Sequence, residues 1–242
     1  MEPKKDIIFE LRCAFNSKEF KHKSYVNDGE ERVLQFVEGF KSFFYHFNKH
    51  VGFYENVYVI DNTVNDKSEV DKRILNAIPS EANIIFSYKK TKNKHGQNNK
   101  GAGLIESWEA NWPVFRNYKY VFFHEPRQKM LNFNLYKNFL QNPTNTFGKY
   151  VPRQFNTGSW FMEIKTLKEY ITYRNAESMS ENNITIEADL YDFFNGLDDR
   201  YKPKGNWAPP LDLSLIKKRE YCMLEKINVL WYDQLAKIQR EF

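Results

Sequence analysis

The sequence predicts an α/β protein with a doubly wound, mainly parallel sheet flanked by helices, followed by a C-terminal helical segment. Three observations lead to this prediction. Short apolar runs alternate with longer amphipathic runs, the links between them are short, and the run over 120–123 is apolar throughout. Alternating strands and helices form parallel neighbours, and a strand covered by helices on both faces is apolar at nearly every position.

The first half of the chain is predicted to alternate four strands with three helices. Apolar residues three and four positions apart, such as Phe36, Phe40 and Phe47, favour one long amphipathic helix. Pro113 is expected to kink or end the third helix. The strands are predicted over 7–15, 57–60, 83–88 and 120–123, the helices over 30–50, 67–77 and 101–115, and a basic polar loop over 91–99.

The second half is predicted to continue with helices and one further strand. Amphipathic spacing favours the helices, whereas Gly158 opens an apolar run that is typical of a strand. The helices are predicted over 128–140, 166–174, 186–194 and 214–242, and the strand over 158–164.

Composition limits the classes of function. A hydrophobic content of 41% and an aromatic content of 17% are enough for a sizeable core, and the net charge of +5 comes from interleaved basic and acidic residues. No nucleic-acid-binding motif is present, so we expect no nucleic-acid partner. Cys13 and Cys222 form no close pair, which favours a reducing, cytoplasmic location. No run approaches the roughly 18 apolar residues of a spanning helix, so any membrane contact is expected to be peripheral, at the inner face.

Polar side chains follow three of the predicted strands. Arg12 ends the first strand, Asp61 the second, and Glu125 and Arg127 come directly after the fourth. Ligands of open α/β sheets bind beyond the carboxyl ends of the strands, so these residues are candidates for a binding site. A carboxylate such as Asp61 can accept hydrogen bonds from a base or a ribose, or it can cap the turn that follows it.

A helix start between the third and fourth strands forms a candidate anion site. The segment reads Asn99-Lys100-Gly101-Ala102-Gly103 and leads into a predicted helix. Backbone N–H groups at a helix N-terminus, a nearby ammonium group and small residues together favour an anion. The segment matches neither the phosphate-binding P-loop nor the complete dinucleotide-binding fingerprint, and an ordinary helix start is the alternative.

Three segments follow one another: the helix start over 99–103, the strand over 120–123 with its polar end, and Phe155-Asn156-Thr157-Gly158 with the apolar run after it. This order resembles the core of GT-A-fold glycosyltransferases over roughly residues 6–195. The resemblance implies a single GT-A-like domain over 1–242, in which 1–125 binds a nucleotide sugar, 126–212 binds the acceptor and 213–242 forms a helix. It implies transfer of a sugar to a hydroxyl of a glycan or lipid-linked saccharide in surface polysaccharide or glycoconjugate synthesis. The implied donor-binding residues are Arg12, Asp61, Lys100, Gly101, Gly103, Glu125 and Arg127, and the implied acceptor-binding residues are Asn156, Thr157, Gly158 and Trp160.

One motif departs from this family. GT-A enzymes commonly hold Mn²⁺ or Mg²⁺ with an acidic pair after the fourth strand, where this chain has His124-Glu125-Pro126-Arg127. Glu125 is therefore the one candidate ligand for a divalent cation, alone or with His124. Alternatively, Arg127, Lys129 or Lys100 neutralises the leaving phosphate and the protein is metal-independent, or Glu125 and Arg127 form a structural pair.

The resemblance also implies a catalytic base. Inverting GT-A enzymes use a carboxylate beyond the acceptor strand, where this chain carries Glu187 and Asp189. Such a base removes the proton from the attacking hydroxyl. Either carboxylate could instead complement the dipole at the start of a helix.

Two other functions remain open at this point. A nucleotidyltransferase acting on sugar phosphates has a similar sheet and phosphate crevice, but it normally has a loop rich in glycine, arginine and lysine after its first strand, which residues 12–29 lack. A non-catalytic sugar-binding protein is the other alternative. A serine hydrolase is not expected, because no Gly-x-Ser-x-Gly motif is present.

Overall fold

A seven-stranded sheet forms the centre of the protein. The computed structural model describes residues 3–16, 18, 29–197, 217–227, 229–233 and 238–241. The strand order is β3-β2-β1-β4-β7-β6-β8. The strands are β1 (Ile7–Cys13), β2 (Val57–Asp61), β3 (Asn83–Phe86), β4 (Tyr120–His124), β6 (Thr146–Lys149), β7 (Phe155–Glu163) and β8 (Cys222–Leu224).

The sheet is mainly parallel, which confirms the predicted fold class. Strands β3, β2, β1 and β4 run in one direction, while β7 is antiparallel to both β4 and β6. In the register, Cys13 of β1 pairs with Asp61 of β2, and Leu11 pairs with His124 of β4. The carboxyl ends of these three strands therefore meet at one edge of the sheet, where a doubly wound fold binds its ligand.

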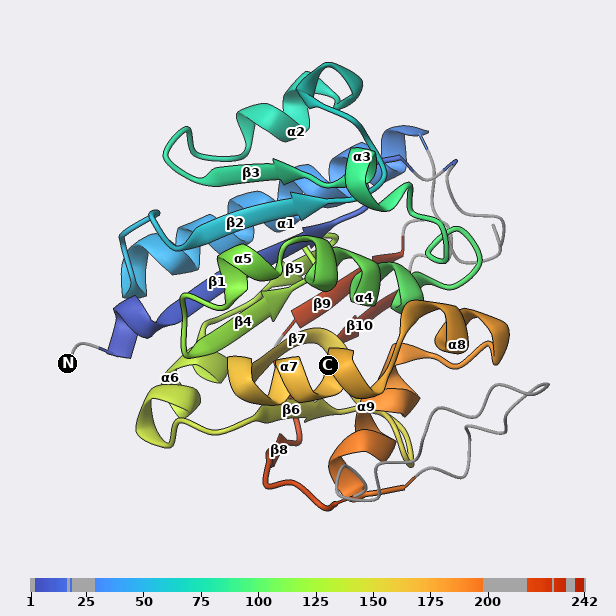
Figure 1. Cartoon of the computed structure of the whole chain (residues 1–242). Helices are drawn as coiled ribbons and strands as arrows, with labels where there is room; N and C mark the ends of the chain where they lie inside the picture. The colour runs from blue at the N-terminus through green and yellow to red at the C-terminus, as the bar shows by residue number, and fades with distance from the viewer. Residues whose placement is uncertain are drawn as a thin grey trace.

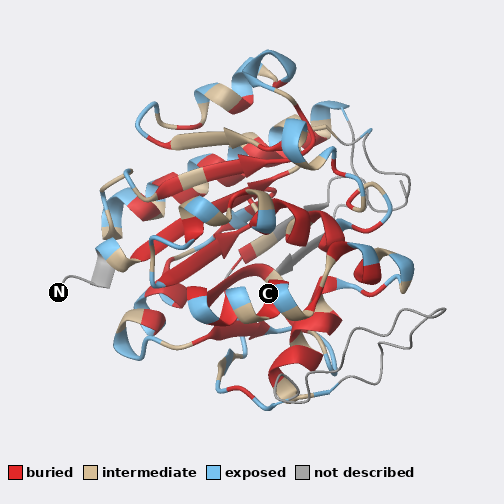
Figure 2. Ribbon diagram, in the orientation of Figure 1, coloured by how far each residue is buried: buried red, intermediate tan, exposed pale blue. Residues whose placement is uncertain are grey.

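Helices cover both faces of the sheet (Figure 1). Helix α1 (Gly29–His50) lies on one face, and α4 (Lys100–Ala110), α5 (Trp112–Phe115), α7 (Ile164–Tyr173) and α9 (Ile186–Asn195) lie on the other. Side chains alternate along each strand, so Phe9 and Leu11 join the core under α1, whereas Ile8 joins the core under α4. Figure 2 shows the resulting buried sheet between partly exposed helices.

Helix α1 confirms the predicted long amphipathic helix. Its phenylalanines at the predicted spacing are all buried, and they pack on one another and on β1. The rings of Phe43 and Phe47 stack with centroids 5.6 Å apart, and Phe47 meets Phe9 edge-on at 5.0 Å. Each buried phenylalanine contributes about 1.5–3 kcal/mol relative to an exposed one.

Two predicted helices are divided into shorter ones. Over 67–77, a 3₁₀ turn (Lys67–Glu69) precedes α2 (Lys72–Asn76), because the Asp71 carboxylate caps α2 by accepting a hydrogen bond from Arg73 N at 2.8 Å. Over 101–115, the break is at Asn111, so that Pro113 lies in the first turn of α5, where proline is tolerated. The short α3 (Tyr88–Thr91) also follows β3 directly, where the strand was predicted to continue.

The prediction of one helix over 128–140 was wrong in its first part. Residues Gln128–Met130 form β5, which pairs with β9 (Val229–Asp233) in a separate three-stranded sheet completed by β10 (Ile238–Glu241). Helix α6 follows β5 over Asn134–Gln141. Strand β6 and helix α8 (Ala176–Glu181) were not predicted.

The predicted C-terminal helix over 213–242 was also wrong. The described residues of this segment form strands: β8 pairs parallel to β6, and β9 pairs with both β5 and β10. The rest of the predicted helix lies outside the described residues. Strand pairing stabilises these short segments, and a sequence pattern does not reveal a partner so distant along the chain.

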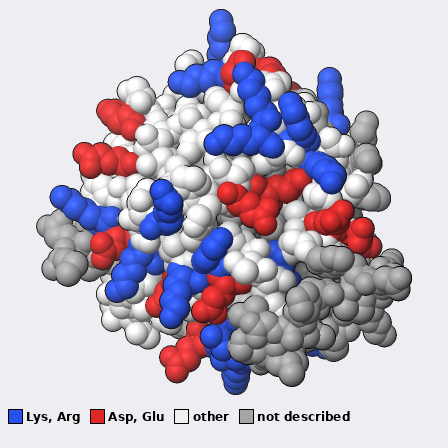
Figure 3. Space-filling view, viewed as in Figure 1, with Lys and Arg blue, Asp and Glu red and all other residues white. Residues whose placement is uncertain are grey.

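None of the helices in the described part of the chain is both long enough and apolar enough to cross a membrane. Basic side chains gather over α2 and α3 on the face shown in Figure 3, with acidic side chains next to them. This mixture agrees with the interleaved charges of the sequence.

Candidate functional site

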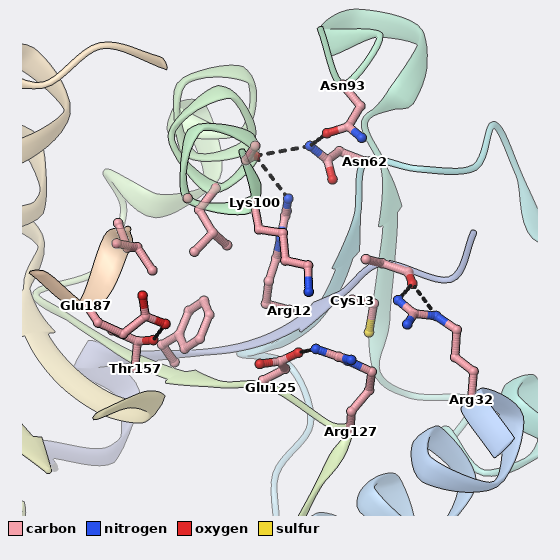
Figure 4. Close-up of a pocket in the computed structure, with 16 residues that line it drawn as sticks. Arg12, Cys13, Arg32, Asn62, Asn93, Lys100, Glu125, Arg127, Thr157 and Glu187 are labelled. Carbon is pink, nitrogen blue, oxygen red and sulfur yellow. Dashed lines mark hydrogen bonds and ion pairs between the residues drawn. The ribbon is translucent and has the colours of Figure 1, made fainter. Parts of the chain in front are cut away.

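A cavity of about 180 Å³ lies beyond the carboxyl ends of β1, β2 and β4, against the first turn of α4. Four cationic side chains from four different elements line it: Arg12 of β1, Arg32 of α1, Lys100 of α4 and Arg127 of the link between β4 and β5 (Figure 4). Among the described residues, the lining contains two carboxylates, those of Glu125 and Glu187. The excess of positive charge favours an anionic ligand.

Arg12 is fixed in the floor of the cavity by neutral groups. Its guanidinium donates hydrogen bonds to the hydroxyl of Ser107 and, at 3.1 Å, to the carbonyl of Gly103. Glu10 lies beneath it, and burial raises the pKa of this carboxyl to about 7, although the charge of Arg12 and a hydrogen bond from Trp108 both lower it. These bonds hold the Arg12 side chain at the floor of the cavity, between β1 and the first turns of α4.

Glu125 and Arg127 form an ion pair at the end of β4. Burial raises the pKa of the Glu125 carboxyl, but Arg127, Lys100 and Arg32 together outweigh burial and hold the pKa below its usual range. Glu125 is therefore ionised at neutral pH.

The backbone of this pair is held closely against α1. A Cβ atom on Gly39 would lie 1.5 Å from the carbonyl oxygen of Pro126, so only glycine permits this approach. The amide of Glu125 also donates to the carbonyl of Gly158 at 2.9 Å. These contacts fix where Arg127 enters the cavity.

Arg32 completes the cationic wall from the first turns of α1. It donates to the carbonyl of Ala14 just after β1, and its guanidinium is buried. Burial first, and then repulsion from Arg127, lower the pKa of Arg32 to about 9. The cations destabilise one another, and an anion in the cavity would relieve that repulsion.

The first turn of α4 begins at the residues for which the sequence predicts an anion site. Asn99 caps it by accepting a hydrogen bond from Ala102 N at 3.2 Å, and its amide donates to the carbonyls of Met179 and Ile184. A Cβ atom on Gly101 would lie 2.8 Å from the sulfur of Met179 and 3.0 Å from Cβ of Ile186, so a larger residue here would have to displace these side chains.

Anion binding is expected to weaken at alkaline pH through Lys100. Desolvation first, and then repulsion from Arg127 and Arg32, lower the pKa of Lys100 to about 8. The ammonium form attracts the ligand, so affinity should be highest at lower pH and fall by about tenfold as the pH rises from about 7 to about 9. Titration calorimetry with a nucleoside triphosphate checks this. The Lys100→Arg variant is the control and should show a smaller pH dependence, since only the part that Arg32 contributes near pH 9 remains. An unchanged pH dependence in that variant would contradict the prediction.

The structure places Asp61 in a turn and not in the cavity. Its Oδ1 accepts hydrogen bonds from the backbone amides of Thr63 at 2.6 Å and Val64 at 2.9 Å, and its Oδ2 accepts one from Phe15 N at 2.7 Å. Asp61 is fully buried. The donor-binding role expected for it is corrected to the turn-capping role, because both of its oxygens are occupied.

Trp160 and Asp189 also lie away from the cavity. Trp160 is 1% exposed and stacks on Phe123 in the core under α4, so it cannot provide an acceptor platform. Asp189 is 1% exposed, pairs with Arg174 at 3.0 Å and accepts a hydrogen bond from Tyr170 at 2.6 Å. The structure therefore contradicts a role for Asp189 as catalytic base.

The Asn156-Thr157-Gly158 segment contributes one residue to the cavity. Asn156 accepts a hydrogen bond from Gly158 N at 2.9 Å in a local turn, and a Cβ atom on Gly158 would meet the side chain of Gln128. Thr157 lines the cavity and donates to Glu187 at 2.9 Å. Glu187 and Thr157 thus form a hydroxyl–carboxylate wall beside Lys100 and Arg12 (Figure 4).

Three lining residues with guanidinium or amide side chains were not predicted from the sequence: Arg32, Asn62 and Asn93. Arg32 lies at the start of a helix and resembles any surface arginine in sequence. Asn62 follows Asp61 and could have been included as a strand-end residue. Asn93 lies between lysines in the basic loop, and nothing in the sequence distinguishes it from the other polar residues there.

The residues at the predicted metal position do not form a metal site by themselves. The Glu125 carboxylate faces three cations, and His124 is buried, stacks on Phe43 and bonds Ser159 through Nδ1 at 2.7 Å. Burial lowers the pKa of His124 to about 4. Within the described ranges, no group of three histidine, cysteine, aspartate or glutamate residues could hold a metal ion.

No protein-family model and no curated protein matches this chain. Solved structures with a similar fold include a cytidylyltransferase from Leptospira borgpetersenii (10% identity, 74% of this chain and 72% of that one, TM-score 0.42). Another is a mannose-1-phosphate geranyltransferase from Thermus thermophilus (6% identity, 77% of this chain and 67% of that one, TM-score 0.44). A third is a 4-diphosphocytidyl-2C-methyl-D-erythritol synthase from Anaerococcus prevotii (12% identity, 75% of this chain and 83% of that one, TM-score 0.41).

These findings correct the main expectation about function. None of these three structures is described as a glycosyltransferase, and one of them is a cytidylyltransferase, so the expectation of a glycosyltransferase is not carried further. Identities of 6–12% concern the arrangement of elements alone. The chemistry of this chain has to be argued from its own cavity.

Proposed function

We propose that this chain is a nucleotidyltransferase that acts on a sugar phosphate. The observation that carries the proposal is the convergence of Arg12, Arg32, Lys100 and Arg127 in one cavity, against two carboxylates. A nucleoside triphosphate and a phosphate monoester bring many negative charges together in one complex. A wall of four cations supports binding both of them at once.

The reaction fits the charged groups of the cavity. A phosphate oxygen of the sugar phosphate attacks the α-phosphorus of the triphosphate, and the bond from that phosphorus to the oxygen bridging the β-phosphate breaks. Pyrophosphate then leaves with the electron pair. Preorganised cations stabilise the charge on the equatorial and leaving oxygens, which is the main requirement of phosphoryl chemistry.

This reaction needs no general base, because a phosphate nucleophile is already ionised at neutral pH. The position of Asp189 in the core is therefore no obstacle to the proposal. The carboxylate of Glu187, next to the Thr157 hydroxyl, is suited instead to accept hydrogen bonds from sugar hydroxyls.

The glycine-rich and basic loop expected of a nucleotidyltransferase is not needed for charge neutralisation here. Arg32 of α1 and Lys100 of α4 bring cations to the same end of β1. Lys100 also stands at a helix N-terminus, whose backbone amides favour a phosphate.

Turnover with substrate pairs tests the proposal. The purified chain is incubated with each of the common nucleoside triphosphates and a panel of sugar 1-phosphates, and release of pyrophosphate is measured. One triphosphate with one class of sugar phosphate is expected to give pyrophosphate and a nucleotide sugar in equal amounts. If the chain binds neither triphosphates nor sugar phosphates, the proposal is wrong.

Nucleotide binding is expected to persist without divalent cations. Four protein cations, rather than an acidic pair, face the phosphates, so affinity for a nucleoside triphosphate measured in EDTA should stay within about tenfold of that in Mg²⁺. Titration calorimetry in the two buffers checks this. A loss of more than about a hundredfold, restored by Mn²⁺ or Mg²⁺, would show that the site depends on a metal at Glu125.

A further inference from the structure

The loop over 92–99 carries a buried amide into the cavity. Lys92 and Asn93 both have left-handed backbone conformations, with φ of 53° and 45°, and they turn the chain sharply after α3. Asn93 is 1% exposed and lines the cavity, next to Asn62, which donates to its Oδ1 at 3.2 Å (Figure 4). Among the described residues, Nδ2 of Asn93 has no hydrogen-bond acceptor. Such a buried donor favours a ligand acceptor.

A carboxylate of α4 holds this loop in place. Glu106 is 9% exposed, and its two oxygens accept the backbone amides of His95 at 3.0 Å and Gly96 at 3.2 Å. A charged acceptor that binds two consecutive backbone donors fixes both the position and the orientation of a turn.

The loop backbone also touches the helix directly. A Cβ atom on Gly96 would lie 2.8 Å from Cα of Gly103 and 1.9 Å from Oδ1 of Asn93. The carbonyl of Gly103 in turn accepts hydrogen bonds from Arg12 at 3.1 Å and Asn62 at 3.0 Å. The first turns of α4 therefore set the place of the loop relative to the floor of the cavity.

We propose that Glu106 is a positioning residue for substrate binding: it holds the loop so that Asn93 donates a hydrogen bond to an uncharged acceptor of the nucleotide. This inference rests on the proposed function, because it requires a bound nucleotide. The four cations account for the phosphates, whereas Asn62 and Asn93 add neutral amide groups at the end of the cavity where Arg12 reaches the carbonyl of Gly103. A ligand with both an anionic and a neutral polar part fits this division.

The Glu106→Gln variant tests the proposal. A glutamine has one acceptor oxygen in place of two, and its amide would face a backbone N–H. Affinity for the preferred nucleoside triphosphate should fall about tenfold, whereas affinity for inorganic pyrophosphate, which meets only the cations, should stay within about twofold. Glu109→Gln is the matched control, since Glu109 is exposed on the same helix and should leave both affinities unchanged.

A double-mutant cycle shows whether Glu106 acts through Asn93. Asn93→Ala alone should weaken triphosphate binding about tenfold, and adding Glu106→Gln to it should have less than about a twofold further effect. If Glu106→Gln weakens pyrophosphate binding as much as triphosphate binding, or if the two substitutions are additive, the proposal is overturned and Glu106 is merely structural. If the wild-type chain binds pyrophosphate but no triphosphate, both this proposal and the proposed function fail. Wild-type triphosphate binding with an unaffected Glu106→Gln variant overturns this proposal alone.

Discussion

Replacing Arg127 with methionine is expected to lower turnover of a triphosphate and sugar phosphate by about 10²–10³-fold. Arg127 is 8% exposed, pairs with Glu125 and lines the cavity together with it, so its charge acts in surroundings where water screens little. Methionine keeps the apolar stem and removes only the guanidinium. Its loss should also raise the pKa of Glu125, because Arg127 is the strongest of the charges that lower it.

Steady-state kinetics with pyrophosphate detection checks this prediction. Arg73→Met is the matched control, because Arg73 pairs with Glu30 and Asp71 on the surface and should not affect turnover. Turnover of Arg127→Lys should lie between that of Arg127→Met and that of Arg73→Met, since lysine keeps the charge but loses the planar fork of donors. An Arg127→Met variant that keeps its fold and turns over within about threefold of wild type would exclude Arg127 from the site.

The centre of the fold could be predicted from the sequence because its signals are local. Residues 120–123 are apolar at every position and form the central strand β4, and the phenylalanines of α1 follow the helical period. Two of the failures share one cause. Strands β5 and β8 have three residues each, and each is held by pairing with a strand far away in the sequence.

The candidate site was predicted in part, because some of its residues follow local signals and others come from distant segments of the chain. Arg12, Lys100, Glu125 and Arg127 were predicted from strand ends and a helix start, and the structure brings them into one cavity, although their roles stay predictions. Arg32 comes from the first turns of α1, which sequence reasoning did not connect with the strand ends. Asp61 has the expected position at the end of its strand, but only the structure shows that backbone amides already donate hydrogen bonds to both of its oxygens.

The wrong expectation about function has a chemical explanation. The order of strands and helices was shared by both enzyme classes considered, since each binds a nucleotide at the same edge of the sheet. Attack at a sugar carbon and attack at a phosphorus differ in what the second substrate needs: a base for a hydroxyl, or cations for a phosphate. Of the two predicted bases, Asp189 is held in a core ion pair, whereas Glu187 lines the cavity together with the four cations.

Replacing Trp160 with alanine is expected to lower the free energy of unfolding by about 3–5 kcal/mol. The indole stacks on Phe123 with centroids 4.8 Å apart and an interplanar angle of 5°, and it meets Trp108 edge-on at 6.0 Å. Removing it leaves a cavity between the sheet and α4, where the rigid strand β7 cannot collapse to fill the space.

Urea denaturation followed by far-UV circular dichroism measures this effect. Trp112→Ala is the matched control, since Trp112 is half-buried at the edge of the same core. This substitution should lower the free energy of unfolding clearly less than Trp160→Ala does. Triphosphate affinity, measured where the Trp160→Ala variant is still folded, should change by less than about threefold, because Trp160 does not line the cavity. The opposite result, with stability retained and sugar phosphate binding lost, would show that Trp160 binds substrate and does not stabilise the core. The stacking on Phe123 makes that result incompatible with the packing of this sheet, so the two measurements together decide the role of this residue.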